Sequence, residues 1–442
     1  MDEPLDLLAD LIAKARAAGA DAADAVLLNG TSLAVQHRLG KTEHVERAEG
    51  RDLGLRVFLG KRAAIVSSSS VDPAGFATLA ERAVAMARVV PEDPFAGLAE
   101  TAAPPQAVDL DLEDPAEPST EALLARAAEA QAAALAVSGV TNSEGASAGY
   151  NRSEAFIATS AGFAGRLART SHSISATALA GSGTAMQRDY DYHSVVHLAD
   201  LDSPADIGRS AGERAVARLN PVRPQTAKLP VVYDPRVAGG LLGHLAGAIN
   251  GASVARGTSF LKDKLNTRVF APGIHVHDEP RRVRGLRSRP FDGEGTPTAP
   301  RALISDGVLT TWLLDSRSAR QLGLTSTGHA SRGTGGPSPG PTNLYLAAGK
   351  PTPAELMADI RLGLYVTELI GMGVNNVTGD YSRGAAGFMI RDGVLAEPVA
   401  EVTVAGNLLD MFAHLTPAND LRFRRGTDSP TVRVEGMTMA GA

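Results

Sequence analysis

Two histidines four residues apart are the first feature of the sequence that suggests chemistry. His193 and His197 have the spacing that places two metal ligands on one face of a helix. A helical zinc-peptidase motif also carries Glu directly after the first histidine, and here that position is Ser194. The flanking sequence QRDYDYHSVVHLADL is typical of a strand, in which residues four apart lie about 13 Å from each other. We therefore interpret the pair as two partly exposed strand histidines rather than a metal site.

A second pair of histidines, His275 and His277, precedes a run of arginines. On a strand, residues two apart share a face, which admits a metal site. The Asp278-Glu279-Pro280 sequence that follows favours an exposed strand end and a turn. The arginine run has no interleaved aromatic residues for stacking on bases, so we expect a solvated face or a subunit contact rather than a nucleic-acid site. Its members are Arg281, Arg282, Arg284, Arg287 and Arg289.

Two glycine-rich segments complete the candidates. Residues 331–341 are followed by the strand-like NLYLA instead of the helix that a phosphate loop requires, so we expect a mobile surface segment or a wall for an extended peptide. Residues 379–388, GDYSRGAAGF, predict a tight polar turn in which Asp380 pairs with Arg383. No nucleophile–base pair is evident in either segment, so the residues alone favour a structural role.

Composition excludes several classes of protein. The 442 residues carry a net charge of −6, which gives no support for direct nucleic-acid binding. Cysteine is absent, so no zinc site in this chain can use a thiolate. No apolar run approaches the roughly 20 residues that span a bilayer, and acids rather than bases precede the first apolar residues. We therefore expect a soluble, cytoplasmic protein with no membrane contact.

The pattern of elements predicts an α+β fold. The N-terminal half is expected to contain helices packed on mixed or antiparallel sheets, and the C-terminal half to be mainly β with a few helices. We place the domains at 1–222, with sub-blocks of about 1–100 and 110–222, and at 223–442. Short strands separated by glycine and Asn-Gly are predicted at 26–28, 33–35, 53–59 and 63–66. Helices are predicted at 5–18, 73–89, 119–135, 203–219, 235–250 and 352–370.

The polar segment 379–388 also carries a family resemblance. Together with residues 367–373 and 401–408, it resembles the C-terminal signature of TldD/PmbA proteins, also known as peptidase family U62. Residues 92–98, 290–295, 313–320 and 323–330 resemble the PmbA, or TldE, branch. The blocks follow one another in family order. The resemblance marks a set of signature residues with a substrate or structural role: Asp380, Tyr381, Ser382 and Arg383.

The resemblance also bears on zinc. TldD-type members resemble zinc metallopeptidases with a His-Glu-x-x-x-His helix and a C-terminal cysteine ligand. The matching helix of this chain aligns Gly243 with the first histidine, His244 with the glutamate and Ala248 with the second histidine. We therefore expect these to be degenerate zinc-motif positions, with no catalytic residue, no metal ligand and no cofactor in this chain, and zinc in a TldD-type partner.

The function implied is that of a PmbA/TldE-type, non-catalytic subunit. It would belong to a TldD/TldE-like zinc metallopeptidase complex that acts on unfolded or modified peptides, as a heterodimer with a TldD-type chain or as a homodimer, with an extended peptide as substrate. The label "modulator of DNA gyrase" describes an indirect phenotype. Two alternatives stay open. One is a self-sufficient metallopeptidase with a site at His193, His197 or His275, and the other is a non-catalytic homodimeric peptide-binding protein.

Overall fold

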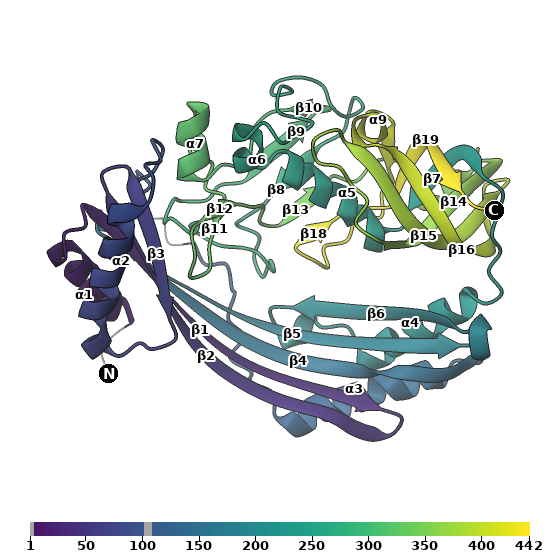
Figure 1. The fold of residues 1–442 in the computed structure, drawn as a ribbon. Helices are drawn as coiled ribbons and strands as arrows, with labels where there is room; N and C mark the ends of the chain where they lie inside the picture. Colours follow the sequence, from purple (N-terminus) through teal and green to yellow (C-terminus); the bar gives the residue numbers. More distant parts are fainter. Residues whose placement is uncertain (1–3, 101–107) are drawn as a thin grey trace.

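The computed structural model describes residues 4–100 and 108–442 of the chain. Its N-terminal half contains one six-stranded sheet with four helices (Figure 1). The elements of this half are α1 (Pro4–Ala17), β1 (Ala22–Arg38), β2 (Lys41–Leu59), β3 (Arg62–Ser68), η1 (Pro73–Gly75), α2 (Phe76–Val89), α3 (Thr120–Leu135), β4 (Val140–Thr159), β5 (Ala164–Ala180), η2 (Gly183–Ala185), β6 (Gln187–Val195), η3 (Leu198–Asp200) and α4 (Pro204–Ala217).

Two similar units build this sheet. Each unit is a three-stranded meander between two helices, and the antiparallel pairing of β1 with β4 joins the meanders in the order β3-β2-β1-β4-β5-β6. The helices begin where the sequence predicts. Ser119, for example, accepts a hydrogen bond from the backbone N–H of Ala122 as the N-cap of α3. The predicted α+β class is confirmed, whereas the domain boundary at 222/223 stays a prediction.

The strands are longer than the sequence suggested. Asn29-Gly30 was expected to separate two short strands, but it lies inside β1, with Gly30 opposite Gly50 of β2 on one side and Ser153 of β4 on the other. Pairing on both sides supplies the backbone hydrogen bonds that a turn would otherwise make. The local turn signal is therefore overridden by the sheet.

Alternation along β1 defines the two faces of the sheet. Ala25 packs in a core with α1 and α2, and Val35 packs in a second core with α3 and α4. Val26 points to the opposite face and lies in one apolar cluster with Phe163 and with Phe291 of the C-terminal half. All four helices therefore cover one face, while the other face is turned toward the C-terminal half (Figure 1).

The C-terminal half contains a mixed six-stranded sheet, a five-stranded sheet and a two-stranded hairpin. Their orders are β16-β15-β14-β7-β19-β17, β10-β9-β8-β13-β18 and β11-β12. The elements are β7 (Ala227–Tyr233), α5 (Pro235–Ala248), α6 (Gly251–Ala255), β8 (Val276–Asp278), β9 (Arg301–Ser305), β10 (Val308–Leu309), α7 (Ser316–Leu322), β11 (Ala330–Ser331), β12 (Ser338–Pro339), β13 (Leu344–Leu346), α8 (Pro353–Met357), β14 (Leu362–Ile370), β15 (Asp380–Arg391), β16 (Val394–Asn407), α9 (Leu408–Ala413), β17 (Leu415–Pro417), β18 (Thr427–Asp428) and β19 (Val432–Ala440).

Helix α5 holds the two larger sheets together. Its buried residues Leu241 and Leu245 lie in one core with Val231 of β7 and Val276 of β8. The helix predicted at 352–370 is wrong beyond its first turns, since α8 ends at Met357 and residues 362–370 form β14. Parallel pairing with β7 makes this segment an inner strand of the sheet. Among the described residues, no helix is both long and apolar enough to cross a membrane.

Candidate functional site

The candidate site is centred on helix α5, whose start is encoded locally. The Asp234 carboxylate accepts a hydrogen bond from the backbone N–H of Arg236 at 2.9 Å, and Pro235 occupies the first helical turn. One face of the helix carries the leucines that reach the core. The opposite face is open, because a Cβ atom added at Gly240, Gly243 or Gly247 would meet nothing within 4 Å.

The three positions aligned with the zinc motif face different surroundings. Gly243 is exposed, His244 is half-buried and Ala248 is fully buried. A catalytic zinc ion takes about three protein ligands, and α5 offers one imidazole. Across residues 4–100 and 108–442, no group of three or more His, Asp or Glu side chains is placed to hold a metal ion. The residues of this helix therefore do not fit a hydrolytic zinc centre.

His244 packs against Tyr381 of the signature segment. The two ring centroids are 5.9 Å apart with the rings nearly perpendicular, at 79°. Burial lowers the pKa of His244, and the positive charge of Arg383 lowers it further. The imidazole is therefore neutral at neutral pH, as suits an aromatic contact within an apolar helix face.

Tyr381 has an unusual environment for a tyrosine. It is 2% exposed, burial raises its pKa, and the adjacent hydroxyl of Tyr233 partly offsets that rise. The neighbouring hydroxyl of Tyr233 donates to Met437 Sδ at 3.2 Å. The two tyrosine hydroxyls and Met437 therefore form a small polar group enclosed within the C-terminal core.

The signature segment is a strand and not the tight turn that its glycines and polar residues suggested. Asp380 and Ser382 are exposed, whereas Tyr381 lies on the buried face of β15. The Asp380 carboxylate bonds to Thr378 Oγ1 at 2.6 Å and to Asn407 Nδ2 at 3.3 Å, and these bonds lower its pKa.

The local ion pair predicted for the signature is wrong. Arg383 Nε donates to the Ile370 carbonyl oxygen at 3.3 Å, and the salt bridges of the described residues do not include Asp380 with Arg383. An odd spacing along a strand places the two side chains on opposite faces.

One glycine of this segment is required by close packing. A Cβ atom at Gly387 would lie 1.8 Å from the Tyr365 carbonyl oxygen of the neighbouring strand. The register of β14 and β15 shifts beside it, as in a β-bulge. Gly384, three residues earlier, has no neighbour closer than 3.5 Å. Close packing therefore requires glycine at position 387 but not at position 384.

The other candidate histidines have protein partners. His193 lies on β6, as predicted, but it is buried rather than partly exposed, and its Nδ1 accepts from the Asp202 backbone N–H at 3.1 Å. His197 lies beyond the end of β6 and not on a strand, and its Nε2 is 3.1 Å from the Asp111 carbonyl oxygen. His275 and His277 stack with centroids 6.1 Å apart, and the second also stacks on Tyr345. Among the described residues, none of these histidines belongs to a group of three or more His, Asp or Glu side chains that could hold a metal ion.

The arginine run is only partly solvated: Arg284 and Arg287 are exposed, and Arg284 also contacts the N-terminal half of the chain. Arg284 contacts the carboxylates of Asp111 at 2.6 Å and Asp200 at 2.9 Å, both in the N-terminal half. Arg282 stacks over the Phe423 ring at 3.6 Å. These two arginines therefore form contacts within the chain.

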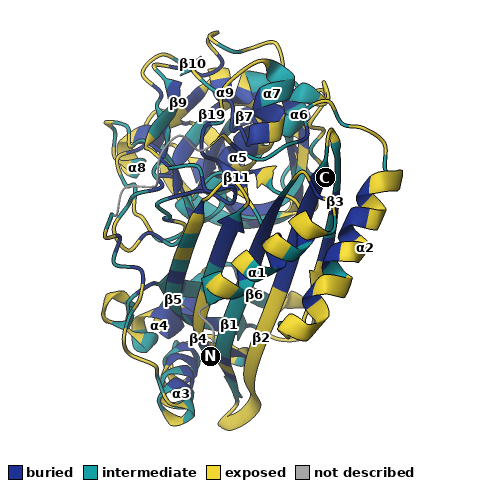
Figure 2. Cartoon of the chain, turned by 90° about the vertical axis from the view of Figure 1, so that its left-hand side faces the viewer, coloured by how far each residue is buried: buried dark blue, intermediate teal, exposed yellow. Residues whose placement is uncertain are grey.

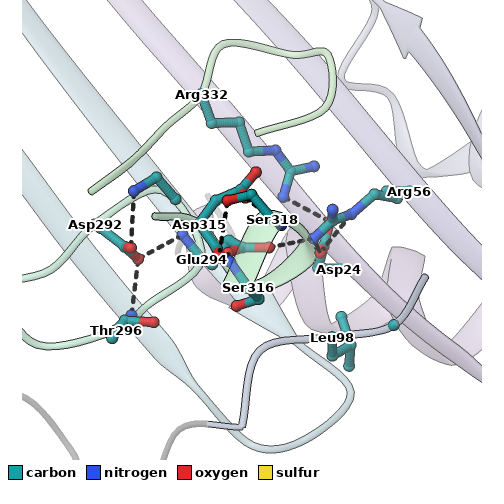
Figure 3. Close-up of polar contacts among 12 residues, drawn as sticks. Asp24, Arg56, Leu98, Asp292, Glu294, Thr296, Asp315, Ser316, Ser318 and Arg332 are labelled. Atoms are coloured by element: carbon teal, nitrogen blue, oxygen red, sulfur yellow. Dashed lines mark hydrogen bonds and ion pairs between the residues drawn. The ribbon is translucent and has the colours of Figure 1, made fainter. Parts of the chain in front are cut away.

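Sequence reasoning missed a buried cluster of charges that joins the two halves. Asp24 of β1 contacts Arg56 Nε of β2 at 2.9 Å and Arg332 Nη1 at 2.6 Å, and Glu294 is 3.5 Å from Arg56 (Figure 3). Burial alone would raise the pKa of Asp24, but the two guanidinium groups outweigh it and lower the pKa. Arg332 belongs to the glycine-rich segment 331–341, which is thus an anchored hairpin and not a mobile surface segment.

A second buried carboxylate lies beside this cluster. Asp292 accepts hydrogen bonds from the backbone N–H groups of Glu294 and Thr296, both at 2.9 Å, and of Ala330 at 3.0 Å (Figure 3). Burial and the negative charge of Glu294 raise the pKa of Asp292 to about 6. The motif PFDGEG was visible in the sequence, but no spacing rule connects it with residues 24 and 56.

Comparison with known proteins gives a consistent result. Three domain models match this chain: "PmbA/TldA metallopeptidase domain 1" at 23–87, the central domain at 113–219 and the C-terminal domain at 226–441. The chain is 38% identical to "Metalloprotease PmbA" of Escherichia coli O157:H7, over 95% of this chain and 92% of that protein. It is 34% identical to "Metalloprotease PmbA homolog" of Haemophilus influenzae, over 96% and 93%.

Solved structures agree with the sequence comparison. A "putative modulator of DNA gyrase" from Bacteroides thetaiotaomicron matches all of both chains with a TM-score of 0.92 and 27% identity. TldE from Thermococcus kodakarensis has a TM-score of 0.88 at 20% identity, over 98% of this chain and 100% of that one, which shows the shared fold.

Proposed function

The chain belongs to the PmbA/TldD metallopeptidase family, and we propose that it serves there as a PmbA/TldE-type subunit without a zinc site of its own. Its partner would be a TldD-type chain that holds the zinc, and the complex would act on unfolded or modified peptides. The observation that supports this is the composition of α5, with Gly243, His244 and Ala248 at the motif positions.

The side chains at these three positions provide too few ligand atoms for a catalytic zinc ion. Glycine and alanine offer no ligand atom beyond the backbone, whose carbonyl groups are engaged in the helix. A single neutral imidazole leaves two of the three protein ligands of a catalytic zinc unprovided. It also leaves no carboxylate beside the metal to activate water. Peptide hydrolysis would therefore depend on groups from another chain.

The open face of α5 fits a role in contact rather than catalysis. Glycine permits the backbone of another chain to approach closely, and this face presents Gly240, Gly243 and Gly247. Nearby Met372 is 93% exposed and Ile370 is 60% exposed, so apolar surface is available at the β14–β15 connection. An extended peptide or a partner chain would be recognised mainly through its backbone and through such apolar contacts.

The test is a reconstitution with a TldD-type chain. The purified chain alone should leave an unfolded peptide intact, and cleavage should appear when a zinc-loaded TldD-type chain is added. Cleavage should disappear when the first histidine of the partner's motif is replaced by alanine. Cleavage by this chain alone, sensitive to a chelator, would contradict the proposal.

A matched set of substitutions separates this function from a self-sufficient peptidase. His193→Ala, His197→Ala and His275→Ala should leave cleavage by the reconstituted complex within about twofold of the unsubstituted complex. Loss of cleavage by any of these variants, with normal folding and partner binding, would favour a peptidase site in this chain.

A further inference from the structure

A cavity of about 360 Å³ lies on the face of the N-terminal sheet that is turned toward the C-terminal half (Figure 1). Two neighbouring rows of residues, each crossing β2, β1, β4 and β5, form its floor. One row is Asp52, Leu28, Ala155 and Leu167, and the other is Gly50, Gly30, Ser153 and Arg169. Residues paired across strands point to the same side of a sheet, so both rows face the cavity. Its volume lies within the range of about 300–1,000 Å³ that is typical of ligand sites.

The floor of the cavity is open in one row and apolar in the other. A Cβ atom added at Gly30 or Gly50 would meet nothing within 4 Å, so the space above these glycines is free. Leu28 and Leu167 are half-buried and pack at the edge of the apolar cluster that contains Phe291. The cavity opens toward β2, because Gly50 belongs to the exposed part of that strand, which Figure 2 shows in yellow.

The end of the cavity at β5 carries a positive charge without a counter-charge. The two Nη atoms of Arg169 donate to the carbonyl oxygens of Leu286 and Ser288. Among the described residues, no carboxylate forms a salt bridge with Arg169. Burial and the positive charges of Arg289 and Arg287 lower its pKa to about 10, so the guanidinium is still charged at neutral pH.

Arg289 adds a second buried positive charge to this end. Its Nε and Nη2 atoms are buried and have no hydrogen-bond partner among the described residues. Burial lowers the pKa of Arg289 more than the carboxylates of Asp292 and Asp278 raise it. A buried charge that is incompletely paired costs free energy, and a bound anion would offset that cost.

We propose that this cavity binds a peptide through a carboxylate at Arg169, with the adjoining apolar side chain against Leu28 and Leu167. The choice of a peptide rests on the proposed function, whereas the need for an anion beside an apolar group follows from the lining of the cavity. A guanidinium forms charge-assisted hydrogen bonds with a carboxylate. Asp52, at the other end of the floor, repels further negative charge, which disfavours a phosphate chain or a strongly acidic peptide.

The dimensions of the floor suit a short extended segment. Neighbouring strands lie about 4.8 Å apart, so the floor spans about 14 Å from β2 to β5. This is the length of about four extended residues. The carboxylate itself has two possible sources, namely the C-terminus of the peptide and an Asp or Glu side chain.

Isothermal titration calorimetry with three N-acetylated tetrapeptides tests the proposal and separates these sources. The first peptide is three alanines followed by leucine with a free C-terminus, the second is its C-terminal amide, and the third is an amide in which glutamate replaces the alanine before the leucine. The free acid should bind at least about tenfold more tightly than the simple amide, because the amide lacks the charge. Recovery of affinity by the third peptide would assign the site to a side-chain carboxylate as well, and no recovery would assign it to the C-terminus alone.

Two substitutions connect the binding with this cavity. Gly30→Val fills the open space with a residue that strands favour, so the chain should fold normally and bind the free acid at least about tenfold more weakly. Ala34→Val is the matched control, because Ala34 lies on the same face of β1 but does not line the cavity. Arg169→Gln keeps an amide donor for the two carbonyl groups and removes the charge, so the free acid and the amide should then bind equally.

The binding measurement is independent of peptide cleavage, because it uses this chain without a TldD-type partner. The proposal is overturned if the wild type shows no binding of the free acid at about 1 mM, the range of a weak ligand, or binds acid and amide equally. Normal binding by a folded Gly30→Val variant, or inorganic phosphate that binds more tightly than the free acid, would also overturn it. Acid-specific binding without cleavage by the reconstituted complex would contradict the proposed function and leave this site in place.

Discussion

The guanidinium of Arg332 lies 2.6 Å from a carboxylate oxygen of Asp24, although the two residues are 308 positions apart. Both side chains are almost completely buried, at 1% and 2% exposure. The contact connects the hairpin β11–β12 with the first strand of the N-terminal sheet. Because Arg56 binds the same carboxylate, Asp24 is the common partner of two buried cations.

Replacing Asp24 should therefore be strongly destabilising. Asp24→Asn leaves Arg56 and Arg332 with less negative charge in a buried position, and the free energy of unfolding should fall by about 3–5 kcal/mol. Urea unfolding followed by circular dichroism measures the change. Arg209→Ala removes an exposed pair with Asp206 on α4 and should cost less than about 1 kcal/mol. Equal effects of the two substitutions would show that the buried cluster is not a structural link.

Asp292 should make stability depend on pH in the opposite sense to an ordinary paired carboxylate. Its pKa is raised from 3.8 to about 6 in the folded chain, so the folded state binds the proton more tightly than the unfolded state does. The free energy of unfolding of the wild type, relative to Asp292→Asn, should fall by about 3 kcal/mol as pH rises from about 4 to about 7. A difference between the two proteins that is constant or that grows with pH would contradict this assignment.

Two glycines of one strand should respond differently to a methyl group. Gly387→Ala places Cβ against the Tyr365 carbonyl oxygen and should lower the free energy of unfolding by about 3 kcal/mol or more, or prevent folding. Gly384→Ala meets only ordinary van der Waals contacts and should change it by less than about 1 kcal/mol. Thermal unfolding of both variants checks the contrast, and similar values for the pair would rule out the steric explanation.

The hydroxyl of Tyr381 is enclosed beside the hydroxyl of Tyr233, so it is expected to contribute a little to stability and nothing to peptide contact. Tyr381→Phe should change the free energy of unfolding by less than about 1.5 kcal/mol. Denaturant unfolding gives the stability, and KM for an unfolded peptide in the reconstituted complex should be unchanged. A loss of more than about 2 kcal/mol, or a changed KM, would contradict this assignment.

Hydrophobic periodicity and capping residues were sufficient to predict the positions of most helices in the N-terminal half, because these signals depend only on neighbouring residues. Helix α3 begins after Ser119 and helix α5 after Asp234, in agreement with the ranges 119–135 and 235–250 expected from the sequence. Local signals gave the wrong secondary structure where pairing with distant strands determines the conformation. Asn29-Gly30 lies within a strand, and the second part of the predicted helix 352–370 forms β14.

The residues of the candidate site also fall into those that could be predicted from local sequence and those that could not. The helix at 235–250 and the strand position of His193 could be predicted from the sequence pattern. The buried cluster of Asp24, Arg56 and Arg332 could not, because its members come from separate elements and no periodicity relates them. The Asp380–Arg383 pair was expected from proximity in sequence, yet strand geometry separates the two side chains.

The zinc content of the purified chain tests the central claim most directly. After zinc loading and removal of free metal, inductively coupled plasma mass spectrometry of this chain alone should give well below one zinc ion per molecule, while a TldD-type chain treated in parallel should retain about one. One tightly held zinc ion per molecule of this chain, lost when His244 is replaced by alanine, would contradict the account.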